Sequence, residues 1–157
     1  MEVQVSVKSI ITNNYIGGSA PYCGGKPWTF NLQPTTTGAY FKGILVAGPN
    51  YNNTSSVQRN TIQNIRILKW GSTFIGIHAA GGSLDIGTEQ PNLIGSLTGD
   101  SSIVNISLIQ GIYGNIAIFD SEMPYIRIEN NIIAGMTASY LEGINLETKR
   151  ASISHNL

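Results

Sequence analysis

The sequence predicts an all-β protein in which short strands wind into stacked coils, an arrangement known as a parallel β-solenoid. Residues 60–82 hold two alternations of apolar residues, Ile65 with Ile67 and Ile75 with Ile77, separated by a glycine-containing turn. Alternation of period two is typical of strands, and similar segments recur along the chain. Gly, Asn, Ser, Thr and Ile are abundant and charged residues make up 11% of the chain, which favours strands and turns over disorder.

The spacing of the apolar alternations predicts coils of about 20 residues. Taking the second apolar residue of each strand as a marker gives separations of 19, 22 and 20 positions along the series Ile67, Ile86, Leu108 and Ile128. We therefore expect these four side chains to stack as a buried aliphatic ladder. Truncating Leu108 to Ala in such a ladder is expected to cost about 2–5 kcal/mol.

A second repeat relates the start of the chain to residues 126–135. Placing Ile11 on Ile128 superimposes the Asn pair 13–14 on the Asn pair 130–131 and matches glycines 18 and 135. Stacked amides can pair between neighbouring coils. We expect such pairing for Asn13, Gln110 and Asn130.

The intervening residues of each strand should point outward and form columns on the surface. Arg66 and Asp85 are predicted to be outward neighbours on adjacent coils, as a solvated pair. A second outward column, of small and apolar residues, would be covered by another chain: Leu45, Gly76, Ala117 and Asn145. Residues 19–27, 48–60 and 135–142 are predicted to be surface loops, the last with at most one helical turn.

Composition sets bounds on function. A chain of 157 residues predicts one domain spanning residues 1–157, and its zero formal net charge argues against nucleic acid or an anionic membrane as partner. No apolar run approaches the roughly 20 residues of a membrane span, and the first residues do not resemble a signal peptide. We expect no metal or cofactor, because neither His78 nor His155 has ligands at metal-binding spacing. Cys23 is interpreted as an incidental loop thiol.

Short I-x-I strands followed by Asn-bearing turns and a Gly-Ile strand occur in IQNIRILKWGSTFIGIHAAG, IVNISLIQGIYGNIAIFDS and PYIRIENNIIAG. This pattern resembles the right-handed parallel β-helix of pectate-lyase-like proteins, and more narrowly the phage tailspikes that use this fold. The resemblance covers roughly residues 60–148. It implies stacked coils, a homotrimer or larger spike assembly, and recognition of polysaccharide, in some members with cleavage. It carries no catalytic motif over to this chain.

Two sets of side chains could serve a polysaccharide. Glycoside cleavage uses paired carboxylates, and the candidates are Asp85, Glu89, Asp120 and Glu122, for which ordinary turn or surface roles are favoured. Aromatic rings with a polar handle suit partly wet contacts with sugars. The aromatic candidates are Trp70, which is preferred, Trp28, Tyr40, Tyr51 and Tyr113.

The expected function is a polysaccharide-binding or structural segment of a trimeric tailspike-type adhesin, located on a virion tail or outside the cell. The alternative is a polysaccharide lyase or glycoside hydrolase that acts on bacterial surface polysaccharide. Both ends of the chain start strands without an evident cap, so another chain or further segment is expected to cover them.

Overall fold

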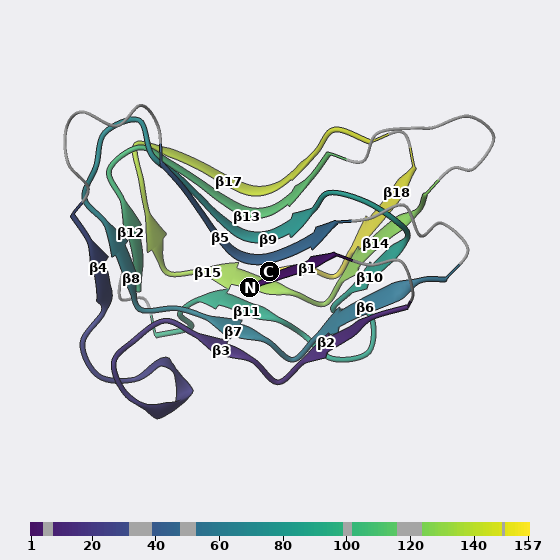
Figure 1. The fold of residues 1–157 in the computed structure, drawn as a ribbon, viewed down its shortest axis with the longest axis horizontal. Helices are drawn as coiled ribbons and strands as arrows, with labels where there is room; N and C mark the ends of the chain where they lie inside the picture. Colours follow the sequence, from purple (N-terminus) through teal and green to yellow (C-terminus); the bar gives the residue numbers. More distant parts are fainter. Residues whose placement is uncertain (5–7, 32–38, 48–52, 99–101, 116–123, 149) are drawn as a thin grey trace.

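The computed structural model describes residues 1–4, 8–31, 39–47, 53–98, 102–115, 124–148 and 150–157. They form a right-handed parallel β-helix (Figure 1), which confirms the predicted fold class. Every ladder between named strands is parallel, and each coil passes through four sheets in turn. The core inside the coils consists mainly of aliphatic side chains, whose burial stabilises the fold.

Sheet A contains the longest strands: β1 (Glu2–Gln4), β5 (Tyr40–Ala47), β9 (Thr73–Ala79), β13 (Leu108–Gly114) and β17 (Tyr140–Leu146). Sheet B contains β2 (Ile10–Thr12), β6 (Ser55–Gln58), β10 (Leu84–Ile86), β14 (Ile126–Glu129) and β18 (Ala151–Ser154). Sheet C contains β3 (Tyr15–Ile16), β7 (Thr61–Ile62), β11 (Leu93–Gly95) and β15 (Ile132–Ala134). Sheet D contains β4 (Trp28–Phe30), β8 (Ile65–Ile67), β12 (Ile103–Asn105) and β16 (Met136–Thr137).

The coils are longer than the predicted 20 residues. The stacked residues of one column in sheet B, of which the first four are buried, are 46, 29, 42 and 25 positions apart: Ile11, Val57, Ile86, Ile128 and Ile153. Four strands and their turns occupy at least 25 residues, and inserted loops lengthen the other coils. The apparent period of 20 arose because similar I-x-I strands occur in different sheets.

The predicted ladder of four stacked residues is therefore wrong as a column. Ile86 and Ile128 do stack in sheet B, but Ile67 lies in sheet D and Leu108 in sheet A. Ile67, Ile86 and Ile128 are buried, whereas Leu108 is half-buried and its neighbour Ile109 fills the core. The large loss of stability that the sequence predicted for truncation of Leu108 is therefore expected for truncation of Ile109 instead.

The repeat between the start of the chain and residues 126–135 is confirmed. Ile11 and Ile128 occupy the same column of sheet B, and Gly18 and Gly135 both have positive φ at equivalent positions of the next turn. Asn13 and Asn130 also have positive φ, near 58° and 57°. Asn tolerates this conformation better than most residues, so it suits the sharp turn from sheet B into sheet C.

The residues that follow these turns form the amide ladder that the sequence predicted, but with different members. Each side-chain amide donates to the carbonyl oxygen of the next, with N to O distances of 2.8–2.9 Å. Gln110 pairs elsewhere, with a carboxylate on sheet A. The ladder consists of Asn14, Asn60, Asn92, Asn131 and Asn156.

The predicted pair of Arg66 and Asp85 is also wrong. Arg66 lies in sheet D between Thr29 and Val104. Asp85 lies in sheet B and forms a bidentate ion pair with Arg127 on the next coil, with N to O distances of 2.6 and 2.7 Å.

Two segments predicted to be loops contain strands. Residues 48–60 include β6, whose Val57 is fully buried, and residues 135–142 include β16 and the start of β17. Residues 19–27 do leave the stack, with a short 3₁₀ turn at Pro21–Cys23. Cys23 is buried under this loop, and its Sγ lies 3.6 Å from the Thr61 carbonyl oxygen.

Candidate functional site

The candidate site is built on a bend in sheet A. The chain contains four Gly-Ile dipeptides, and the register places all four glycines in one column: Gly43, Gly76, Gly111 and Gly143. Figure 1 shows that β5, β9, β13 and β17 curve together at their middle. A Cβ on Gly76 would lie 2.8 Å from a methyl group of Ile94 in sheet C, and Gly43 and Gly111 likewise face isoleucines of sheet C, so at these three glycines the two sheets approach closely.

Gly and the following Ile both face the interior, which interrupts the alternation of the strand. Ile44, Ile77 and Ile112 are fully buried in the core cluster. The outward positions on either side of the bend are consequently three residues apart. On each strand they therefore flank the bend as a pair, and their side chains can meet across it.

We call the outward side of this sheet the sheet A face. Its columns, read from the first coil to the fourth, consist of Tyr40, Thr73, Leu108 and Tyr140; Lys42, Ile75, Gln110 and Glu142; Leu45, His78, Tyr113 and Asn145; and, on the last two coils, Asn115 and Glu147. The predicted column of Leu45, Gly76, Ala117 and Asn145 is corrected here: Leu45 and Asn145 share a column, Gly76 belongs to the inward glycines, and Ala117 lies outside the described residues.

Hydrogen bonds join the polar side chains of the third and fourth coils across the bend. Gln110 Nε2 and Asn145 Nδ2 both donate to Oε2 of Glu142, at 2.7 and 2.8 Å. These two bonds lower the pKa of Glu142 because they favour its charged form. The Glu142 carboxylate is thus held in position and stays ionised at neutral pH.

Tyr113 and His78 extend this network toward the second coil. The Tyr113 hydroxyl donates to Glu147 Oε2 at 3.1 Å. The pKa of Tyr113 is raised, mainly by burial of the hydroxyl and secondly by its hydrogen bond to the Glu147 carboxylate. The His78 ring lies 5.0 Å from the Tyr113 ring, centroid to centroid, and its Nε2 is 2.7 Å from Asn115 Oδ1.

His78 itself is buried, with 6% of its surface exposed, and among the described residues its Nδ1 has no hydrogen-bond partner. Burial is the main cause that lowers the pKa of His78; the bond to Asn115 opposes this shift and the positive charge of Lys42 adds to it. The imidazole is therefore neutral at pH 7, and its ring packs beneath Tyr113 as a flat, uncharged surface.

The aromatic candidates are spread over the molecule. Tyr40 and Tyr113 lie on the sheet A face, and Tyr40 is exposed. Trp28 lies on β4 in sheet D, and Trp70 lies in the turn between β8 and β9 with 72% of its surface exposed. Tyr51 is outside the described residues.

The carboxylate candidates do not join the aromatic ones. Asp85 is paired with Arg127 on sheet B, and Glu89 is an exposed residue of the turn between β10 and β11, whose backbone N–H donates to Gln58. Asp120 and Glu122 are outside the described residues. The structure thus brings together two of the predicted residues, Tyr40 and Tyr113, on one sheet.

Sequence reasoning missed His78, Gln110, Glu142, Asn145 and Glu147 as members of this site. A signal for the first four was present, because the four Gly-Ile dipeptides are 32–35 positions apart and each is flanked by two members of the face. The segments are KGIL, IGIH, QGIY and EGIN. Aligning them would have placed Lys42, Gln110 and Glu142 in one column.

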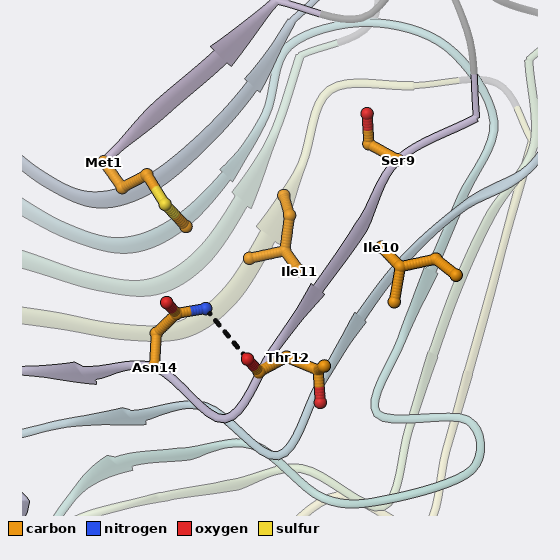
Figure 2. Close-up of a pocket in the computed structure, with 6 residues that line it drawn as sticks. All are labelled: Met1, Ser9, Ile10, Ile11, Thr12 and Asn14. Carbon is orange, nitrogen blue, oxygen red and sulfur yellow. Dashed lines mark hydrogen bonds between the residues drawn. The ribbon is translucent and has the colours of Figure 1, made fainter.

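The described residues also form hollows at other places. One of about 350 Å³ lies beside β2 (Figure 2) and is lined by Met1, Ser9, Ile10, Ile11, Thr12 and Asn14. In Figure 2 the Asn14 amide reaches back to the Thr12 carbonyl oxygen at 3.3 Å. Because Asn14 is also the first member of the amide ladder, its polar atoms serve the fold.

Comparison with protein-family models, with curated proteins and with solved structures finds no match to this chain. Within the described part of the chain, three His, Cys, Asp or Glu side chains never gather as a metal site would require. The described residues also contain no helix with the length and hydrophobicity of a membrane span.

Proposed function

We propose that this chain is a polysaccharide-binding segment of a spike-type adhesin and that it holds the glycan on the sheet A face. The observation that carries the proposal is the hydrogen-bonded array of Gln110, Glu142 and Asn145 beside the half-buried ring of Tyr113. Fixed planar polar groups next to an aromatic ring suit sugars, which present both hydroxyl groups and apolar C–H faces.

The repeat of the face along the helix axis fits a polymer better than a small ligand. Successive coils are about 4.8 Å apart, so the four strands that carry the face span roughly 14 Å. Each coil contributes its own pair of side chains flanking the bend. An extended chain of sugars could contact several coils, and many modest contacts would add up to useful affinity.

The proposed place of the chain is a larger assembly, a homotrimer or longer spike on a virion tail or outside the cell. Its support is the resemblance of the sequence to tailspike β-helices. Light scattering of the purified chain that shows a stable, soluble monomer would contradict this part of the proposal.

Binding to a panel of bacterial surface polysaccharides tests the proposal, with Tyr113→Ala as the variant and Trp70→Ala as the control. Tyr113→Ala removes the ring at the centre of the face and is expected to weaken binding at least tenfold. Trp70 lies outside the sheet A face, so its truncation is expected to change binding less than twofold. If the two effects are reversed, the glycan binds elsewhere.

The same incubation separates binding from cleavage. A binding segment leaves the polysaccharide intact, whereas a lyase creates unsaturated ends and a hydrolase creates new reducing ends. Either product would favour the enzymatic alternative.

A further inference from the structure

The orientation of the amides on the sheet A face determines which atoms an outside ligand would meet. A carboxylate only accepts hydrogen bonds, so Gln110 and Asn145 must both turn their NH₂ groups toward Glu142. This fixes the amide orientation from chemistry alone. The Asn145 amide oxygen therefore points away from Glu142 and can accept a hydrogen bond from a ligand.

The third and fourth coils present further acceptor oxygens beside the Asn145 amide oxygen. The Tyr113 hydroxyl donates its hydrogen bond to Glu147, so toward an outside partner the Tyr113 oxygen can act only as an acceptor. Glu142 is half-buried and Glu147 is exposed, and both present carboxylate oxygens, which accept hydrogen bonds. This end of the face accepts hydrogen bonds and repels anions.

Positive charge lies at the opposite end of the face. Among the described outward residues of sheet A, the cationic side chain is Lys42 on the first coil. Lys42 and Glu142 occupy one column three coil spacings apart, which is roughly 14 Å. That separation exceeds the Debye length of about 8 Å in physiological salt, so Lys42 does little to offset the two carboxylates.

We infer that the ligand is a neutral, hydroxyl-rich polysaccharide, which donates its hydroxyl groups to Glu142, Asn145 and Glu147 and packs a sugar ring against Tyr113. This inference rests on the proposed function and specifies its ligand. A uronate or sulfated glycan would bring anionic oxygens against protein oxygens that are negatively charged or can only accept hydrogen bonds. Such contacts are repulsive and select against an anionic ligand.

Chemical reduction of carboxyl groups supplies a matched pair of ligands. The test compares an acidic, uronate-containing polysaccharide with the same polymer after its carboxyl groups have been reduced to primary alcohols, together with neutral bacterial polysaccharides. The neutral and the reduced polymers are expected to bind at least tenfold more tightly than the acidic one at low salt. Added salt should narrow this difference because it screens the repulsion.

The outcomes separate this inference from the proposed function. If the acidic polymer binds as tightly as its reduced form, or more tightly, the inference is wrong while the proposed function stands. If no polymer binds, the proposed function fails and the inference fails with it. Preference for a polymer of amino sugars over neutral ones would also overturn the inference, since it would identify a cationic ligand.

Glu142→Gln provides a second, independent readout because it removes the charge and keeps the shape. The variant is expected to weaken neutral polysaccharide about three- to tenfold, since one charged acceptor becomes a neutral one, and to leave the acidic polymer unchanged or bound more tightly. Glu89→Gln makes the same charge change in a turn outside sheet A and should alter neither. Equal weakening of both polymers by Glu142→Gln would mean that Glu142 has only a structural role.

Discussion

Substitution of Asn92 by Ala tests how much the amide ladder contributes to the stability of the β-helix. Asn92 is fully buried at the middle of the ladder. Its Nδ2 donates to the Val57 carbonyl oxygen at 2.9 Å and to Asn131 Oδ1 at 2.8 Å. Its Oδ1 accepts from the backbone N–H and the side-chain amide of Asn60, at 3.0 and 2.9 Å.

The expected loss of stability follows from these four bonds. A typical hydrogen bond contributes about 0.5–1.5 kcal/mol net, and a buried donor left without a partner costs about 1–3 kcal/mol. Some groups keep other partners, because Gly87 still donates to the Val57 carbonyl oxygen and the Asn60 side-chain amide still donates to two backbone carbonyl oxygens. The backbone N–H of Asn60 loses its acceptor. We therefore expect Asn92→Ala to lower the free energy of unfolding by about 3 kcal/mol.

Asn14→Ala is the matched control on the first coil. Asn14 is half-buried, and its side chain donates to Asn60 and to Thr12. Its loss should cost about 1 kcal/mol. Equilibrium unfolding in urea, followed by circular dichroism, measures both values. Equal costs for the two variants, or a cost below about 0.5 kcal/mol for Asn92→Ala, would refute the role assigned to the ladder.

Three further predictions concern packing, pH and charge. Gly76→Ala should cost about 2 kcal/mol or more, since its Cβ would lie 2.5 Å from the Gly111 carbonyl oxygen, whereas Gly143→Ala meets nothing within 4 Å and should be nearly neutral in thermal unfolding. Because the pKa of His78 is lowered in the folded state, the unfolded chain binds a proton first as pH falls, and the free energy of unfolding should decrease below about pH 6.5. Urea unfolding at pH 7.5 and 5.5 should show a smaller loss of stability in His78→Gln than in the unchanged protein. An equal loss in both proteins would contradict this prediction. A double-mutant cycle on Asp85 and Arg127 should give a coupling of only about 0–1 kcal/mol that shrinks with salt, because the Arg127 side chain is 46% exposed; a coupling above about 2 kcal/mol would show a stronger role.

The fold class could be predicted because its causes are local in the sequence. Alternating apolar residues specify strands, and the Asn pairs at 13–14 and 130–131 specify the same turn in two coils, with one residue of each pair at positive φ and the other in the amide ladder. The length of a coil could not be read in the same way. Strands such as Ile65–Ile67 in sheet D and Leu84–Ile86 in sheet B look alike in sequence.

The candidate site was harder to predict because it depends on register between coils. Tyr40 and Tyr113 could be selected from their chemistry alone. Glu142 could not be selected in this way, because its place in the site depends on its hydrogen bond with Gln110, which is 32 positions earlier. The two residues are seen to be neighbours only when both strands are aligned on their Gly-Ile dipeptides. Insertions of different length between strands conceal that alignment.

The most direct test of the proposed site is an NMR titration of ¹⁵N-labelled protein with fragments of a neutral polysaccharide. The side-chain NH₂ resonances of Gln110 and Asn145 report on the Glu142 carboxylate to which both donate. We predict that these resonances and the backbone amides of β13 and β17 shift most, while those of sheets B and D stay in place. Shifts concentrated around Trp70 or on sheet B, or no shifts at saturating fragment, would contradict the assignment of polysaccharide binding to the sheet A face.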